Sequence, residues 1–148
     1  MIEQTRGLDF GPGFYLTTNE EQAIRFSNII VNRRGNGSAI VNIYEFDMAF
    51  AENTLVVRRF GSADVEWLEF VVQNRLKTYQ KEIYDIIIGA VANDMVMPTI
   101  QAFIGGFINV EAALITLKTS NLVDQVCLKT ERALSLLRFV RAYETKGA

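Results

Sequence analysis

Residues 10–15, Phe-Gly-Pro-Gly-Phe-Tyr, form the stretch that decides how the front of this chain folds. A proline between two glycines predicts a tight turn, because glycine adopts backbone angles that other residues avoid. The aromatic residues after the turn, with the leucine and threonine that follow them, predict a short strand over residues 14–17. Such a turn also allows the backbone to approach a neighbouring group closely, since glycine has no side chain in the way.

A helix is predicted directly after this strand, over about residues 19–33. Apolar residues recur every three or four positions around Phe26, which places them on one helical face. Thr18 and Glu21 match a capping box, in which each side chain bonds the other residue's backbone N–H at the start of a helix. The two glycines and the asparagine within residues 33–38 predict a loop that ends the helix.

The rest of the chain alternates between short strands and helices. Strands are predicted over residues 39–46, 54–59, 84–89, 123–128 and 137–143, and helices over residues 63–77, 98–103, 109–117 and 130–136. The first of these strands has apolar residues on both faces, which is typical of an interior strand. Ser62 is expected to cap the helix that follows it. The pattern predicts one α+β domain over residues 1–148, without repeats or linkers.

The composition excludes several classes of function. The chain has 148 residues, of which 49% are hydrophobic and 22% charged, and this predicts a folded domain with a sizeable core. A net charge of -2 provides no overall basic field for binding nucleic acid. The chain contains no histidine, which excludes histidine-based metal sites and Ser-His or Cys-His catalytic pairs, and no metal site is predicted.

The expected location is the cytoplasm. Cys127 is the only cysteine, so no internal disulfide can form, and a reducing compartment is favoured. Residues 1–9 contain no apolar segment of the kind that a signal peptide needs. The most apolar stretch, residues 103–117, carries Asn109 and Glu111 and is too short to span a bilayer, so no membrane partner is expected.

The turn and the helix after it resemble a motif of a known family. The Phe-Gly-x-Gly-Phe-Tyr string ends at Tyr15, and a second aromatic residue, Phe26, follows eleven positions later. This spacing resembles the second motif of the diphtheria-toxin and poly(ADP-ribose) polymerase class of ADP-ribosyltransferases. The resemblance implies that Tyr15 and Phe26 stack on the two faces of the nicotinamide ring of NAD, the substrate of that class. It also implies that Gly11 and Gly13 let the backbone approach NAD closely.

Two other features of that class differ in this chain. The class carries a glutamate at the start of a late strand, and the matching residue here is Gln125. A glutamine still accepts a hydrogen bond from the nicotinamide ribose, but it has no charge to stabilise the transition state. The class also carries a His-Gly-Ser or His-Gly-Thr motif on its first strand, and this chain has no histidine. The resemblance therefore implies an ADP-ribosyltransferase-like split two-sheet core, with interleaved helices, that lacks its first strand.

Longer segments resemble an uncharacterised bacterial family related to ADP-ribosyltransferases, whose members are suspected toxins of toxin–antitoxin pairs. The similar segments are residues 8–15, 41–47, 67–75 and 84–94, so the resemblance covers nearly the whole chain. Members of that family carry a Tyr-His-Gly-Ser segment upstream of the turn. Its absence has two explanations, an internal start at Met1 or a degenerate member of the family. A missing strand leaves backbone groups unpaired, so self-association or a bound partner is expected.

Three functions remain open. The first is an NAD-dependent mono-ADP-ribosyltransferase, acting as a bacterial toxin on a protein or nucleic-acid acceptor, with Gln125 as its catalytic residue. The second is an inactive or truncated transferase fold that binds a partner such as an antitoxin, or a second copy of itself. The third is a plain domain in which the motif match is accidental. In that case Tyr15 is a half-buried aromatic residue beside an ordinary turn, Phe26 belongs to the core, and Gln125 is an exposed polar residue at the start of a strand.

Overall fold

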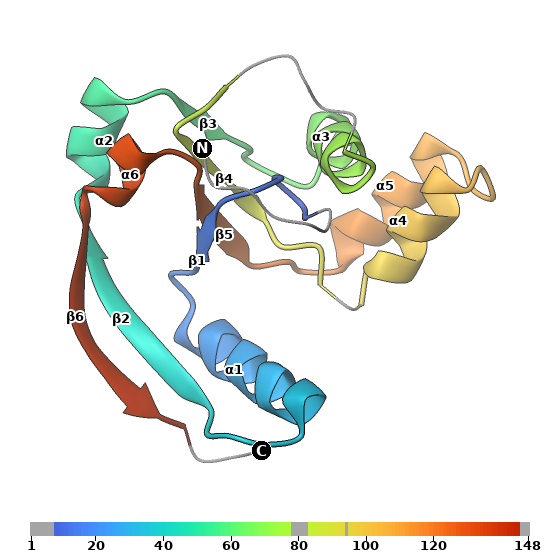
Figure 1. The fold of residues 1–148 in the computed structure, drawn as a ribbon. Coiled ribbons are helices and arrows are strands. Elements are labelled where there is room, and N and C mark those ends of the chain that lie inside the picture. The colour runs from blue at the N-terminus through green and yellow to red at the C-terminus, as the bar shows by residue number, and fades with distance from the viewer. Residues whose placement is uncertain (1–7, 78–82, 94, 146–148) are drawn as a thin grey trace.

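The computed structural model describes residues 8–77, 83–93 and 95–145. Helices lie between successive strands along the chain, with two helices between β4 and β5, and the strands of the described residues form two separate sheets, one of four strands and one of two. The predicted α+β class is therefore confirmed. Figure 1 shows the four-stranded sheet at the centre of the molecule, and the two-stranded sheet as a curved arm that leads away from it.

The four-stranded sheet carries most of the core. Its strand order is β1 (Phe14–Leu16), β5 (Asp124–Leu128), β4 (Ile86–Ala90) and β3 (Val57–Arg59). The pairs β1–β5 and β5–β4 are antiparallel, while β3 and β4 run parallel. Strand β4 is buried along its whole length, which agrees with its continuous run of isoleucines.

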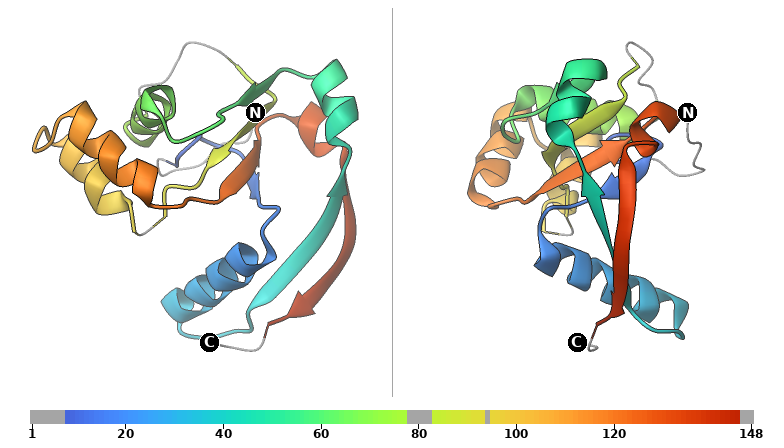
Figure 2. Two further views of the ribbon diagram at one scale, coloured as in Figure 1. Left: turned by 180° about the vertical axis from the view of Figure 1, so that it is seen from behind. Right: turned by 90° about the vertical axis from the view of Figure 1, so that its left-hand side faces the viewer.

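Helices cover both faces of this sheet. One face packs against α3 (Val65–Arg75), α4 (Met97–Ile104) and α5 (Val110–Thr119), through a core cluster that includes Trp67 and Ile87. The opposite face packs against the short helices α2 (Met48–Thr54) and α6 (Glu131–Leu134). Figure 2 shows α4 and α5 as an antiparallel pair that extends away from the sheet.

The arm consists of β2 (Ile40–Phe46), β6 (Leu137–Glu144) and the long helix α1 (Glu20–Arg34), which packs along β2. The prediction that β2 is an interior strand is wrong, because within the described residues β2 pairs with β6 alone. The two apolar faces of β2 have another cause. One of its side chains, Val41, is buried in the arm, while Phe46 packs against the second core cluster of the main sheet.

Acidic and amide side chains begin most of the helices. The N-cap of α1 is Asn19, whose side chain accepts a hydrogen bond from the Gln22 N–H at 2.9 Å, so the predicted capping box at Thr18 is wrong. Helix α3 begins after Asp64 rather than after Ser62. In both cases an Asn or Asp lies close to a predicted Thr or Ser cap. Its side-chain oxygen is at least as good an acceptor for the N–H groups of the first turn, which have no partner within the helix.

Several other boundaries agree with the sequence, but the strand predicted over residues 54–59 covers only Val57–Arg59, because Thr54 belongs to a helix that was not expected. The helices predicted over residues 109–117 and 130–136 are present as α5 and α6, and the structure shows that Asn109 and Thr130 are their N-caps. Pro98 lies in the first turn of α4, where its missing N–H costs nothing. Helix α2 was not predicted, because its seven residues are too few to show a helical period.

Candidate functional site

The structure places Tyr15 and Gln125 on the same face of the four-stranded sheet. Tyr15 lies directly opposite Cys127 in the antiparallel β1–β5 pair. Residues opposite each other share a face, and so do residues two positions apart on one strand, so Gln125 shares this face with both. Diagonal neighbours of this kind have Cα atoms about 7–8 Å apart. Two residues separated by 110 positions in sequence are therefore adjacent in the fold.

The side chain of Tyr15 closes the glycine-rich turn. Its hydroxyl donates to the Gly11 carbonyl oxygen at 2.5 Å and accepts from the Phe10 N–H at 3.1 Å. Its ring stacks on the ring of Phe10, with centroids 6.4 Å apart and planes inclined by 21°. Burial raises the pKa of Tyr15, and the Cys127 thiol beside it raises it further, so the hydroxyl stays protonated as a hydrogen-bond donor.

The two glycines of the turn are required by contacts within the protein. Gly11 has a φ of +78°, and a Cβ atom there would lie 2.7 Å from Oδ1 of Asn74 on α3. A Cβ atom on Gly13 would lie 2.3 Å from the Cys127 sulfur and 3.0 Å from the Leu128 carbonyl oxygen. These glycines therefore allow a close approach of the turn to α3 and to β5, while the approach to NAD stays a prediction.

A buried lysine at the end of β5 attaches the same turn to this strand through hydrogen bonds. Lys129 is 7% exposed, and its Nζ atom donates to the carbonyl oxygens of Phe10 at 2.6 Å and Pro12 at 2.8 Å. Burial lowers the pKa of Lys129, because a charged ammonium group loses its hydration there. Lys129 was not predicted from the sequence to be a site residue. In the sequence, its position directly after the apolar run Val-Cys-Leu is the feature that could have indicated a buried lysine.

Asp9 is the centre of a buried polar cluster that the sequence analysis also missed. The carboxylate is 5% exposed and forms an ion pair with Arg75 of α3, whose Nε lies 2.8 Å from Oδ1. The other oxygen, Oδ2, accepts from the Ala92 N–H at 2.9 Å and from Nε2 of Gln125 at 3.2 Å. Asp9 thus joins the turn to α3, to the segment after β4 and to β5.

These contacts determine the burial of Gln125 and the hydrogen bonding of its amide group. The residue is 9% exposed, so the expectation of an exposed polar residue at a strand start is wrong. Its amide nitrogen donates to Asp9, so the amide oxygen, Oε1, is oriented as an acceptor. A glutamine fits here better than a glutamate would, because a second carboxylate would lie within hydrogen-bonding distance of Asp9.

Phe26 lies on α1 and is 49% exposed. The expectation that it belongs to the core is therefore wrong. Among the described residues its ring makes no contact with the ring of Tyr15, which instead stacks on Phe10. The structure thus brings Gly11, Gly13, Tyr15 and Gln125 together around the turn, and leaves Phe26 on the arm.

A second buried carboxylate, Asp85, lies at the other end of β4. It accepts from the Val56 N–H at 2.9 Å, from the Thr130 hydroxyl at 2.6 Å and from Arg132 at 2.9 Å. Burial raises the pKa of Asp85, but these hydrogen bonds and the arginine charge outweigh burial, and the net pKa lies below its ordinary value. Asp85 attaches α6 to β3 and β4, which is a structural role.

The first prediction concerns the effect of the buried Cys127 thiol on the stability of the protein at alkaline pH. Burial raises the pKa of Cys127 to about 11, whereas a thiol in an unfolded chain ionises near pH 8.5. The native state then holds the proton more tightly, so stability falls as the pH rises above about 8.5. We expect wild type to lose on the order of 1–2 kcal/mol between pH about 8 and about 10 relative to Cys127→Ala, measured by urea unfolding. Parallel pH profiles would contradict this expectation.

Fold and site together define an α+β protein in which a glycine-rich turn is fastened over a four-stranded sheet by a buried carboxylate, a buried lysine and a tyrosine. The chain belongs to the family described as Protein of unknown function (DUF3990), whose model matches residues 1–139. No curated protein and no solved structure gave a match to the chain. Within the described residues, none of the helices is both long enough and apolar enough to cross a membrane.

Proposed function

We propose that the protein is an ADP-ribosyltransferase-like domain that binds NAD beside the glycine-rich turn and transfers ADP-ribose to a macromolecular acceptor, as a bacterial toxin would. The observation that carries the proposal is the adjacency of Tyr15 and Gln125 on one face of the β1–β5 pair. The ring of Phe10 packs on the ring of Tyr15, with centroids 6.4 Å apart, and helps to hold it beside the turn. A pyridinium ring suits an electron-rich tyrosine face through a cation–π contribution.

The two residues have distinct roles in this proposal. Tyr15 stacks on the nicotinamide ring, and the Oε1 atom of Gln125 accepts a hydrogen bond from a hydroxyl of the nicotinamide ribose. In the transfer, the bond from C1′ of the ribose to the nicotinamide nitrogen breaks, and its electron pair leaves with nicotinamide. An acceptor nucleophile bonds to C1′ and releases its proton to solvent. Because Gln125 carries no charge, positive charge that develops on the ribose is weakly stabilised, and transfer is expected to be slow.

A non-catalytic domain that binds a partner such as an antitoxin is the second candidate. The observation that favours it is the exposure of large apolar side chains around α4 and α5, where Phe107 is 86% and Ile115 is 68% exposed. Exposed apolar side chains that gather in one region are typical of interaction sites. The amide at Gln125 favours the same candidate, because a transferase that needs a charge there would be disabled.

NAD binding provides the second prediction, measured by isothermal titration calorimetry. We expect micromolar binding to wild type, binding within about threefold for Tyr15→Phe, and about fivefold weaker binding for Tyr15→Leu, since stacking contributes roughly 1 kcal/mol beyond burial. The phenylalanine variant keeps the ring but loses both hydrogen bonds to the turn, so it separates stacking from the structural role of the hydroxyl.

A matched variant tests the second ring. Phe26→Leu should weaken NAD binding if the helix α1 side chain covers the opposite face of nicotinamide, and its exposed position makes it harmless to the fold. Equal affinity of wild type and Tyr15→Leu, or no binding by wild type, would overturn the proposed NAD site. The partner-binding candidate would then be the one to pursue.

A further inference from the structure

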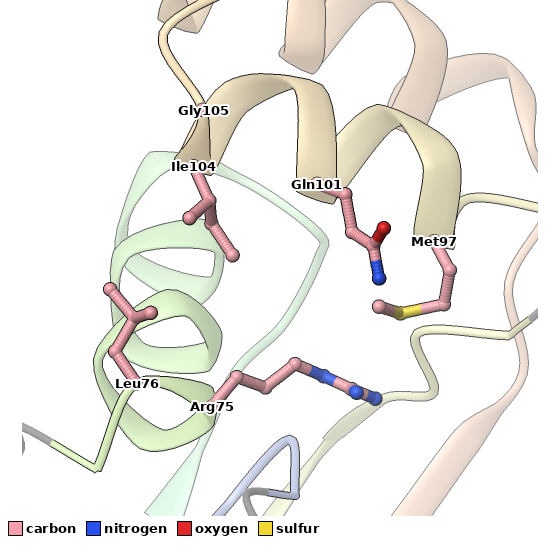
Figure 3. Close-up of a pocket in the computed structure, with 6 residues that line it drawn as sticks. All are labelled: Arg75, Leu76, Met97, Gln101, Ile104 and Gly105. Carbon is pink, nitrogen blue, oxygen red and sulfur yellow. The ribbon is translucent and has the colours of Figure 1, made fainter.

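A cavity of about 440 Å³ that opens widely to solvent lies between α3 and α4, and its lining contains no residue of the turn that forms the proposed NAD site. Its lining consists of Arg75, Leu76, Met97, Gln101, Ile104 and Gly105 (Figure 3). None of the residues proposed to bind NAD lines it. Its volume falls within the range of about 300–1,000 Å³ that is common for small-molecule sites in proteins.

The two ends of this cavity differ in chemistry. Figure 3 shows Leu76 and Ile104 facing each other at one end, from the last turn of α3 and from the end of α4. At the other end the guanidinium group of Arg75 and the carboxamide of Gln101 point toward the same space, with the thioether of Met97 beside them. A ligand that is apolar along its length and polar at one tip would match both ends.

Arg75 determines the charge that the polar tip should carry. Among the described residues that line the cavity, it is the one ionisable side chain. Its Nε and Nη2 atoms donate to Asp9, and these bonds use two of the five N–H donors of a guanidinium group. The ion pair holds the planar group in one orientation, which reduces the entropy lost when a second anion binds. Gln101 can donate from its amide nitrogen to the same anion.

We propose that this cavity binds a carboxylate joined to a short apolar chain, such as a medium-chain fatty acid. The carboxylate accepts hydrogen bonds from Arg75 and Gln101, and the chain lies between Leu76 and Ile104. A phosphate or sulfate would find a charged partner but would leave the apolar end empty. A hydrocarbon without a carboxylate would add no acceptor for the guanidinium group, whose bonds would remain those to Asp9. The two sites share no residue, and they are linked through Asp9, which accepts hydrogen bonds from Arg75 of this cavity and from Gln125 of the proposed NAD site.

Octanoate is the probe that tests the proposal, with ¹⁵N-labelled protein and amide chemical shifts as the readout. We expect residues 75–76 and 97–105 to shift on titration, with a Kd on the order of 1 mM for a ligand of this size. Octanamide, which has the same chain without the charge, and acetate, which has the charge without the chain, should each bind at least tenfold more weakly. Equal binding of octanoate and octanamide would overturn the carboxylate assignment.

Two variants with matched controls locate the binding. Ile104→Trp fills the apolar end and should weaken octanoate binding at least tenfold, while Ile115→Trp adds the same bulk at an exposed position of α5 that does not line the cavity. Gln101→Glu places a negative charge opposite Arg75 and should likewise weaken binding, whereas Gln101→Met should reduce it by only a few-fold. Each spectrum also reports whether the variant is folded. Unchanged octanoate binding by folded Ile104→Trp or Gln101→Glu would overturn the proposal.

Discussion

Replacing Asp9 with asparagine is expected to lower the free energy of unfolding by about 3 kcal/mol at neutral pH, one of the two largest effects in this protein. The carboxylate is buried and accepts hydrogen bonds from Arg75, from the Ala92 N–H and from Gln125. An asparagine of the same shape removes the charge opposite Arg75 and turns one acceptor into a donor that faces other donors. The Asp9 cluster joins four segments, so the loss is not confined to one element. Urea unfolding followed by circular dichroism measures the effect.

A surface ion pair provides the matched control for Asp9. The Nη2 atom of Arg58 lies 2.8 Å from the Oε2 atom of Glu66, and the two side chains are 37% and 69% exposed. Glu66→Gln removes a carboxylate from an arginine in the same chemical way, but in water, and should cost less than about 1 kcal/mol. If both substitutions cost the same, the burial of Asp9 does not govern its contribution, and the cluster is not what holds the turn in place.

Gly13→Ala is expected to cost about 2–4 kcal/mol, through overpacking rather than through backbone strain. The added Cβ atom would lie 2.3 Å from the Cys127 sulfur, and β5 must move to accommodate it. Because β5 pairs with both β1 and β4, a shift of β5 disturbs the middle of the four-stranded sheet. The expected result is a lower urea midpoint with an unchanged slope, which indicates lost stability with the same overall fold.

A double-mutant cycle identifies the atom responsible for this cost. In a Cys127→Ala background the sulfur is absent, so Gly13→Ala should cost at least 1 kcal/mol less than it does in wild type. The Leu128 carbonyl oxygen, 3.0 Å from the same Cβ position, should leave part of the cost in place. Gly61→Ala is the control, since nothing lies within 4 Å of its Cβ position, and it should be nearly neutral. If the costs of Gly13→Ala and Cys127→Ala simply add in the double mutant, the Cys127 sulfur is not the atom that the added Cβ atom clashes with.

The order of the elements could be predicted from the sequence because local rules govern it. The Gly-Pro-Gly turn before β1, the isoleucine run of β4, and the caps at Asn109 and Thr130 all follow from residues a few positions apart. Where the local rules were ambiguous, the prediction failed. A threonine or serine cap close to an asparagine or aspartate was chosen wrongly, and the seven-residue helix α2 was too short to show a period.

The environment of the candidate site depends on contacts that the sequence does not display. Asp9 and Arg75 are 66 residues apart, and Asp9 and Gln125 are 116 apart, so no local pattern links them. Their proximity follows from the placement of β5 between β1 and β4, together with the packing of α3 on the face of the sheet that carries Tyr15. The same packing makes Gln125 a buried partner of Asp9.

By itself, the sequence determined the α+β class, the sharp turn before β1 and the presence of aromatic and amide side chains near it, because these depend on neighbours along the chain. Only the tertiary structure decided which of those side chains meet. It brought Tyr15 beside Gln125, buried Asp9 and Lys129, and left Phe26 on an exposed helix. The physical reason is that burial of a charge or a ring is a property of the packed core, which forms from segments distant in sequence.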